Sequence, residues 1–375
     1  MGVHIKKAET TGEINRFIDF PHELYKGDPN YVPELFIAQK RLFDQKKNPF
    51  FKHSKAEFFF AIDDGKIVGR VAVVKNGNYL KFSGESHGFF GFFDVIDDYK
   101  VAESLLNTVN DWAKKNGFEE VIGPVNFSTN DTCGILIDGL DTPPVIMMTY
   151  HKNYHRDFLE QFGYIKKMDL LAYRLTPQGG DEKVLRIHKQ LEERLKKNGI
   201  TIRKLDMKKF KQEVAKLHHV YNAAWERNWG FVPMTKEEFD FAAEDMKSIV
   251  DIDFAYIAEH NGKAIGFSLT IPNLNEIFIK MKRGRLFPTG LFKLLYYKNK
   301  VKTLRAITLG VIPEFRMAGI DACFYARNIE TARRKNIKWA EASWILENNQ
   351  MMNRALLNIG AKVYKKYRIY TFSIT

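Results

Sequence analysis

The feature that most constrains the fold of this 375-residue chain is an internal repeat. Residues 57–74 (EFFFAIDDGKIVGRVAVV) resemble residues 254–271 (FAYIAEHNGKAIGFSLTI). Each segment has an apolar run, a turn that contains Gly-Lys, and a second, alternating run, which together predict a β-hairpin. Gly69 and Gly266 occupy the same place in the two segments and lie 197 residues apart. Because there are only two long copies, the repeat predicts a duplicated domain rather than a solenoid.

The order of elements after the hairpin is also repeated. Residues 88–125 and 306–344 each read as a strand, a short loop, a helix, a turn and a strand. A helix end and a terminal strand follow, around Gly163 in the first copy and Gly360 in the second. Strands mixed with crossover helices predict an α/β fold, or α+β with a mixed sheet, in which each strand–helix–strand unit is parallel.

A segment with Pro and paired Gly, TPQGGD at 176–181, ends the last strand of the first copy. We therefore predict two domains, 1–178 and 179–375, which suits a chain of this length. The first copy also contains extra residues, which we assign to 127–150. That insertion is rich in Asn, Thr, Asp and Gly, and both a functional loop and a plug of the domain remain open.

Composition excludes several classes of protein. No stretch approaches the roughly 18 apolar residues that a membrane span needs, and the N-terminal segment has no apolar signal region. Cys133 and Cys323 lack paired spacing, which argues against a disulfide framework and a Cys-based zinc site. The histidines also lack the spacing of metal ligands. We expect a cytoplasmic protein without a bound metal.

The net charge is +13, from 58 Lys and Arg against 45 Asp and Glu. Much of the excess lies in residues 183–211 and 280–305. The charge fits a solvated basic surface, or the focusing of an anionic ligand such as a nucleotide cofactor. Association with an acidic membrane or with nucleic acid is a third hypothesis. No recognisable nucleic-acid-binding motif accompanies the charge, so nucleic acid is not the expected partner.

The segment that carries chemistry lies at 311–322. An apolar strand ends at Val311, Pro313 prevents its ladder from continuing, and a loop that contains Gly319 leads into a long helix. Glycine permits a positive φ or a close approach of a ligand to the backbone. A helix start offers unpaired N–H groups and the positive end of the helix dipole, which suits a pyrophosphate. From the residues alone, both a structural turn and a phosphate cradle remain open.

This segment resembles the acyl-CoA pyrophosphate loop of the GNAT superfamily of N-acyltransferases, Q/R-x-x-G-x-G/A. The resemblance implies acetyl-CoA or another acyl-CoA as co-substrate. The implied contacts are Val311, Arg316, Met317, Ala318, Gly319, Ile320, Asp321 and Ala322. Asp321 stands where Gly or Ala is usual, and we interpret it as a helix cap.

A second match, NQMMNRALLNIGAKVY, resembles the N-x-x-A-x-x-L-Y-x-x-x-G-F pattern of the same superfamily. Asn349 falls on its Asn, which implies a further cofactor contact, and Gly360 falls on its Gly. Leu356 falls on the Tyr that often acts as general acid.

The first copy lacks this loop. Its equivalent, DVIDDYKVAESLL, has no Arg or Gly and instead carries Asp94, Asp97 and Asp98. Carboxylates at a helix start suit capping and would repel a pyrophosphate. We therefore predict a degenerate GNAT-like first domain, and an acyl-CoA site in the second.

Acyl transfer to an amine needs a neutral amine, a donor for the oxyanion, and a proton relay. The resemblance implies a backbone N–H donor at Leu309–Val311, so Leu309 is a candidate. Glu341 and Ser343 alternate on a predicted strand and could face the acceptor, although a solvent-facing role is the alternative. The acceptor pocket is predicted around Trp225, Asn228, Trp229 and Phe231, with core packing as the alternative for Trp225.

The leading hypothesis is an acyl-CoA-dependent N-acyltransferase, first of all an acetyltransferase, that transfers directly to a small-molecule or peptide amine. The alternative is a catalytically silent GNAT-fold protein that binds a ligand or a partner. The sequence does not indicate the acceptor, the acyl length or the oligomeric state.

Overall fold

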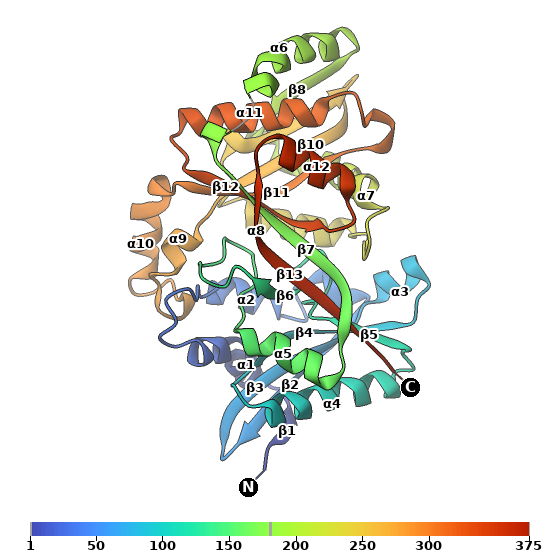
Figure 1. Cartoon of the computed structure of the whole chain (residues 1–375), viewed down its shortest axis with the longest axis vertical. Helices are drawn as coiled ribbons and strands as arrows, with labels where there is room; N and C mark the ends of the chain where they lie inside the picture. The colour runs from blue at the N-terminus through green and yellow to red at the C-terminus, as the bar shows by residue number, and fades with distance from the viewer. Residues whose placement is uncertain (1, 180–181, 375) are drawn as a thin grey trace. The chain divides into compact units, whose positions relative to one another are not determined.

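The computed structural model describes residues 2–179 and 182–374 (Figure 1). Its contacts group the chain into two compact units. Unit 1 comprises Met1–Leu170, Asn275–Asn299 and Lys365–Thr375, and unit 2 comprises Leu171–Leu274 and Lys300–Tyr364. The domain boundary predicted from the sequence, between 1–178 and 179–375, separates the two copies of the repeat. It stays a prediction.

Unit 1 contains a mixed sheet in the order β1-β2-β3-β4-β5-β13-β7, with β6 pairing with β13. Strands β1 to β4 are antiparallel neighbours, whereas β4 and β5 are parallel, as expected for a crossover through a helix. The strands are β1 (His4–Lys7), β2 (Lys55–Asp63), β3 (Lys66–Lys75), β4 (His87–Val95), β5 (Glu120–Gly123), β6 (Ile135–Asp138), β7 (Ile165–Leu175) and β13 (Lys362–Ser373).

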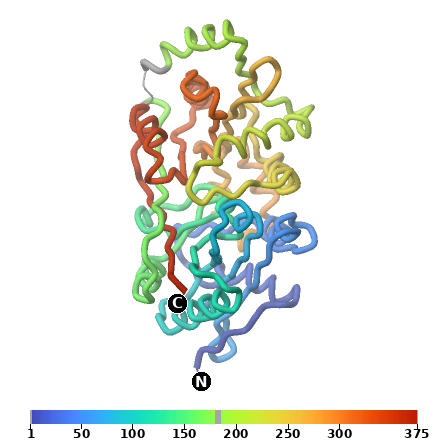
Figure 2. Tube along the Cα trace, turned by 90° about the vertical axis from the view of Figure 1, so that its right-hand side faces the viewer, coloured from blue at the N-terminus to red at the C-terminus, as the bar shows by residue number. Residues whose placement is uncertain are grey.

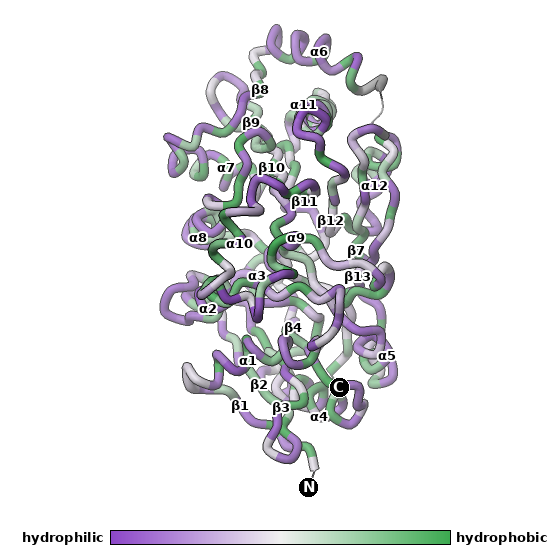
Figure 3. The backbone as a smooth tube through the Cα atoms, turned by 90° about the vertical axis from the view of Figure 1, so that its left-hand side faces the viewer, coloured by the Kyte–Doolittle hydropathy of each residue, from purple (hydrophilic) through white to green (hydrophobic). Residues whose placement is uncertain are grey.

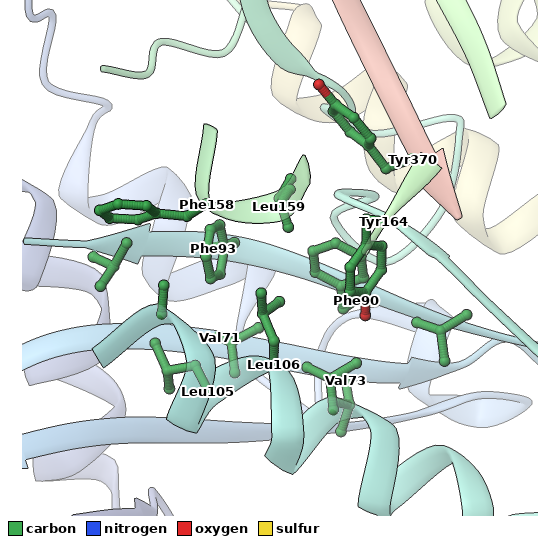
Figure 4. Close-up of a cluster of buried hydrophobic side chains, with 14 of the residues drawn as sticks. Val71, Val73, Phe90, Phe93, Leu105, Leu106, Phe158, Leu159, Tyr164 and Tyr370 are labelled. Atoms are coloured by element: carbon green, nitrogen blue, oxygen red, sulfur yellow. The ribbon is translucent and has the colours of Figure 1, made fainter. Parts of the chain in front are cut away.

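The crossover helix α4 (Tyr99–Lys115) forms the main core of unit 1. Its apolar residues recur at helical spacing, so that Leu105 and Leu106 pack against Val71 and Val73 of β3 (Figure 4). The other helices of the unit are α1 (Thr11–Leu24), α2 (Phe36–Leu42), α3 (Gly77–Ser83), α5 (Asn153–Phe162), α9 (Asn275–Phe278) and α10 (Gly290–Tyr297).

Unit 2 contains a mixed sheet in the order β7-β12-β11-β10-β9-β8. Strands β11 and β12 are parallel and are joined by helix α11, while β8 to β11 are antiparallel neighbours. The strands are β8 (Ile200–Lys204), β9 (Ala255–His260), β10 (Lys263–Pro272), β11 (Thr303–Val311) and β12 (Trp339–Leu346). The helices are α6 (Glu182–Lys197), α7 (Phe210–Trp225), α8 (Lys236–Met246), α11 (Ile320–Arg334) and α12 (Gln350–Asn358).

The terminal strands depart from a simple tandem order. Strand β13, which ends the chain, pairs Tyr370–Ser373 with β5 of unit 1, and Figure 2 shows the red C-terminal end running among the blue and teal N-terminal part. Strand β7, which ends the first copy, contributes Leu171–Leu175 to unit 2, where it neighbours β12. Tyr173 there packs against Ala342 and Leu356.

The predicted fold class, an α/β arrangement with a mixed sheet, is confirmed. The two hairpins that the repeat predicts are present as the antiparallel strand pairs β2–β3 and β9–β10. In the described part of the chain, no helix is both long enough and apolar enough to cross a membrane.

Candidate functional site

The sheet of unit 2 opens between β11 and β12. The two strands pair only from Thr303–Trp339 to Ala306–Ala342, and beyond that point β11 continues along β10. The register with β10 shifts between Leu269 and Thr270, so Ile307 is an extra residue that forms a bulge. Leu309, the predicted oxyanion donor, lies two residues after this bulge.

Arg316 fixes the loop that follows β11. Its Nη2 donates to the backbone O of Ala224 at 2.7 Å, and its Nε donates to the O of Val311 at 3.3 Å. The side chain therefore ties the loop to the ends of α7 and β11. The next residue, Met317, has φ 70° and is 91% exposed, so its side chain takes no part in the core.

Helix α11 begins without a side-chain cap. Its N-cap is Gly319, with φ 90°, and a Cβ there would lie 2.7 Å from Leu191 of α6. The first N–H groups of any α-helix lack intrahelical acceptors, so this end can receive an anion. The expectation that Asp321 caps the helix is wrong, because Asp321 is exposed in the first turn and makes no cap hydrogen bond. A carboxylate there still interacts favourably with the helix dipole.

The other predicted cofactor residues differ in what they offer. Ile320 is buried in the core with Phe324, so only its backbone faces a ligand. Asn349 is the N-cap of α12 and accepts the N–H of Met352 at 3.1 Å. Leu356 is 1% exposed and packs in the core.

A buried polar cluster lies on the face of the unit 2 sheet opposite α11. Arg305 and Glu341 are register partners on β11 and β12, and they are 2% and 0% exposed. The Nε of Arg305 donates to Ser343 Oγ at 3.1 Å, and the hydroxyl of Tyr364 donates to the Glu341 carboxylate. The solvent-facing alternative for Glu341 and Ser343 is therefore wrong, since both are buried.

The end of α7 covers the same face. A Cβ on Gly310 would lie 2.3 Å from the Trp225 indole, which also stacks on Tyr221 with ring centroids 5.0 Å apart. Thr308 precedes Gly310 by two residues, and its Oγ1 is buried without a hydrogen-bond partner in the described part of the chain. An unpartnered buried hydroxyl beside an open strand fits a site that receives a polar ligand.

The predicted acceptor loop follows Trp225. The N–H of Asn228 bonds to the O of Trp225 at 2.8 Å, and the N–H of Phe231 bonds to the O of Asn228 at 3.2 Å. Asn228 and Trp229 are half-buried, and Phe231 is buried. The structure thus brings this loop, the loop at Arg316 and the end of β11 together around the end of α7.

In unit 1 the corresponding opening between β4 and β5 is closed. After β5, the N–H of Val125 bonds to the O of Phe90, and Asn126 Oδ1 accepts the N–H of Phe92, each at 2.6 Å. Helix α4 begins at Asp98, whose carboxylate accepts the N–H of Lys100 at 2.9 Å. The two places that stay open in unit 2, the strand edge and the helix start, are filled by protein groups here.

Unit 1 instead contains a cavity of about 100 Å³ on the side of the sheet covered by α1. The insertion at 127–150 contributes to its wall. Its polar lining includes His22, Tyr25, Tyr31, Arg70, Asp94, Asn126, Thr132, Tyr150 and His151. Asp94 was expected to cap a helix, and this is wrong, because Asp94 lies on β4 and pairs with Arg70, with an N···O distance of 2.7 Å.

Burial shifts the pKa values of the titratable side chains in and beside this cavity. Burial lowers the pKa of His22 to about 4, of His151 to about 3 and of neighbouring His155 to about 4. Burial alone would raise the pKa of Asp94, but the Arg70 guanidinium holds it below its usual value. At neutral pH the cavity therefore offers neutral imidazoles beside a balanced ion pair. Nδ1 of His151 accepts the N–H of Leu136 at 3.3 Å, which leaves its proton on Nε2.

No known family model matches the chain. It is 36% identical over 364 residues to protein YghO of Escherichia coli K12, a match that covers 96% of this chain and 92% of that protein. It is 33% identical over 370 residues to the bacterial ceramide synthase of Caulobacter vibrioides, covering 97% and 95%. Among solved structures, a tandem GNAT protein from the clavulanic acid biosynthesis pathway matches 100% of this chain and 99% of its own, with a TM-score of 0.60 and 10% identity.

The chain has the tandem GNAT fold and belongs to the same family as protein YghO and the bacterial ceramide synthase. A GCN5-related N-acetyltransferase from Sphaerobacter thermophilus shows the same fold, with a TM-score of 0.52, 14% identity and coverage of 99% and 96%. The chain therefore has the tandem GNAT architecture that the sequence resemblance implied.

Some residues of this chain were not found by sequence reasoning. Tyr364, His151 and His155 were given no catalytic or binding role. The only available signal was that two histidines, His151 and His155, follow the insertion at 127–150, without the spacing of metal ligands. Among the described residues, no three His, Cys, Asp or Glu side chains form a group that could hold a metal ion.

Proposed function

We propose that this chain is an acyl-CoA-dependent N-acyltransferase in which unit 2 binds the acyl-CoA. The observation that carries the proposal is the uncapped N-terminus of α11 at Gly319, next to a strand that has left its parallel partner. The pyrophosphate would be bound by the backbone N–H groups of the loop and first turn, Arg316 to Ala322. The acyl group would enter the opening between β11 and β12, where the Thr308 hydroxyl is unpartnered.

The transfer step forms a bond between the amine nitrogen and the acyl carbon and breaks the thioester C–S bond. The proton lost by the amine passes to a base, and the leaving thiolate takes up a proton. We assign the base to the Glu341 carboxylate, which is buried beside the Tyr364 hydroxyl, and Ser343 to positioning the acceptor. The backbone N–H of Leu309 is the proposed donor to the oxyanion.

Direct transfer is favoured over a covalent enzyme intermediate. Cys323 is fully buried in α11, and burial raises the pKa of its thiol to about 12, so it holds its proton at neutral pH.

The acceptor that we propose is a long-chain amine of the sphingoid type. One relative, similar over 97% of this chain, is named a bacterial ceramide synthase, and a ceramide is the amide of a long-chain amino alcohol with a fatty acid. The aromatic loop at Trp225, Trp229 and Phe231 supplies apolar surface for such a chain. A long-chain acyl-CoA is then the expected donor, and acetyl-CoA is the alternative.

A catalytically silent ligand-binding protein is the second candidate function. Two observations favour it: Leu356 replaces the tyrosine that often acts as general acid, and unit 1 contains a polar cavity of its own.

The experiment compares acetyl-CoA with palmitoyl-CoA, each with sphinganine as acceptor, and measures thiol release together with the amide by mass spectrometry. We expect turnover with palmitoyl-CoA and its loss in Glu341→Gln. The matched control is Glu347→Gln, an exposed glutamate at the end of the same strand. Binding of acyl-CoA without turnover of any amine would favour the silent protein, and absence of binding would contradict both the cofactor and the site.

A further inference from the structure

A segment of unit 1 combines cationic and exposed apolar side chains. Residues 280–299 contain six Lys and Arg and no Asp or Glu. The segment includes helix α10, whose sequence GLFKLLYY is apolar except for Lys293. Figure 3 shows this hydrophobic stretch in green at α10.

The apolar side chains of this segment point to solvent. Phe287 is 76% exposed, and on α10 Phe292, Leu295 and Tyr296 are 72%, 65% and 64% exposed. The three helix residues are spaced i, i+3 and i+4, so they share one face. Single exposed apolar residues are ordinary, but four large ones within ten positions form a patch of the kind that marks a binding surface.

The segment is fixed to unit 1 at its base. Arg285 pairs with Asp19 at 2.7 Å and lies 3.4 Å from the centre of the Phe36 ring, and Arg283 pairs with Glu23. Met281 of this segment is buried, as are Ile277 and Phe278 just before it. These contacts hold the base, so α10 presents its exposed face from a supported position.

Further cations flank the apolar patch in the sequence. Lys282 and Lys298 are exposed before and after α10. Lys293 lies within the helix, where its ammonium donates to the backbone O of Lys280. An amphipathic surface with aromatic and leucine side chains on one face and lysines around it is typical of a segment that binds an anionic lipid surface.

We propose that Phe287, Phe292, Leu295 and Tyr296 insert into the interfacial region of an anionic lipid bilayer, with Lys282, Lys293 and Lys298 facing the phosphates. A nucleic acid would satisfy the lysines but would leave the apolar side chains in water. A lipid bilayer satisfies both kinds of group, which is why it is the occupant that the surface favours. This inference does not rest on the proposed enzymatic activity, although it would bring the protein to long-chain substrates.

The test is co-sedimentation of the full chain with vesicles of phosphatidylcholine alone or with 30 mol% phosphatidylglycerol, a composition chosen as about that of a strongly anionic membrane. We expect binding to the anionic vesicles, weakened by 0.5 M salt because the lysine–phosphate attraction is screened. The double variant Phe292→Ser, Leu295→Ser should lower the partition coefficient at least about tenfold, as removal of exposed apolar contact area predicts. Lys282→Glu, Lys298→Glu should abolish the preference for anionic vesicles.

The matched control is Ile165→Ser, which removes a side chain that is 66% exposed elsewhere in unit 1 and should leave binding unchanged. Circular dichroism checks that each variant is folded. Equal vesicle binding by the Phe292→Ser, Leu295→Ser variant would overturn the proposal. So would binding to duplex DNA without binding to vesicles, which would reassign the surface to a nucleic acid.

Discussion

The two units contain the same strand-to-helix turn, but the helix N-terminus is capped by a side chain in unit 1 and uncapped in unit 2. In unit 1, β4 leads to α4, whose N-terminus is capped by the Asp98 carboxylate. In unit 2, β11 leads to α11, which begins at Gly319 with no side-chain cap. Helix N-termini attract anions in both cases, but only the second leaves that attraction to a ligand.

The openings in the two sheets differ in the same way. The N–H of Phe92 on β4 is occupied by the Asn126 side chain, whereas beyond Ala306 strand β11 has left β12 and Thr308 keeps a buried, unpartnered hydroxyl. The fold therefore supplies two equivalent places, and a few side chains decide which can receive a substrate. Each prediction below tests this difference.

The largest effect is expected from the buried Glu341 carboxylate on β12 of unit 2. Glu341→Gln should lower turnover roughly 100-fold or more, the usual range for loss of a general base, with acyl-CoA affinity little changed. Single-turnover kinetics and calorimetry measure the two quantities. Turnover that survives the change would remove Glu341 from the mechanism and would weaken the assignment of chemistry to unit 2.

Acidification should destabilise unit 1 through its cavity. His22, His151 and His155 have pKa values of about 4, 3 and 4 in the folded protein, below their ordinary value near 6.5. The unfolded chain therefore binds more protons between these values, and the stability present above pH 6.5 is lost as the pH falls toward 4. Between pH 6.5 and pH 5 each histidine should cost about 2 kcal/mol.

Urea unfolding at several pH values measures this loss, and hydrogen exchange locates it. His151→Asn keeps an acceptor for the Leu136 N–H but cannot titrate, so it should flatten the pH dependence. An unchanged slope in this variant would show that the cavity is not the cause.

A charge placed in the open loop should weaken acyl-CoA binding. Met317→Glu adds a carboxylate at a side chain that is 91% exposed, so the fold is not disturbed. We expect the dissociation constant to rise about tenfold, since an exposed charge near a helix N-terminus contributes on the order of 1 kcal/mol. The control is Met317→Gln, which introduces a side chain of nearly the same shape as Glu without its charge. Lys100→Glu, in the first turn of α4 in unit 1, should have no effect on binding.

The smallest effect concerns the capped helix. Asp98→Ala should destabilise unit 1 by about 1 kcal/mol through loss of the cap on α4, without creating acyl-CoA binding there, because Asn126 still fills the strand opening. Chemical denaturation and calorimetry measure the two effects. A second acyl-CoA bound by this variant would mean that the cap alone separates the two units.

Local patterns made much of the fold predictable. The hairpins, the crossover helices and the glycine turn at Gly319 could be inferred because turns and periodicity depend on neighbouring residues. Asp98 was correctly expected to cap α4 for the same reason. The wrong expectations were about pairing at a distance: Asp94 binds Arg70 of the next strand, and Glu341 and Ser343 are buried by neighbours that their own alternation does not reveal.

The extra segment around α10 and the positions of β7 and β13 were harder to predict from the sequence. The offset between the copies rises from 197 residues at Gly266 to 216 at Val311, which reflects the extra segment that contains α10. That segment packs in unit 1, although its neighbours in the chain belong to unit 2. Alternating residues indicate that a strand exists, but they do not specify its partner, so the positions of β7 and β13 could not be predicted.

The position of β13 has a consequence for biosynthesis. Its residues Tyr370–Ser373 complete the sheet of unit 1 by pairing with β5, yet they are translated after all of unit 2. The first unit to be translated therefore cannot finish folding before the second unit has been made. Chains released early would expose an unpaired edge at β5, a surface that invites aggregation and recruits chaperones. Quality control can thus detect an incomplete chain through the unit that was synthesised first.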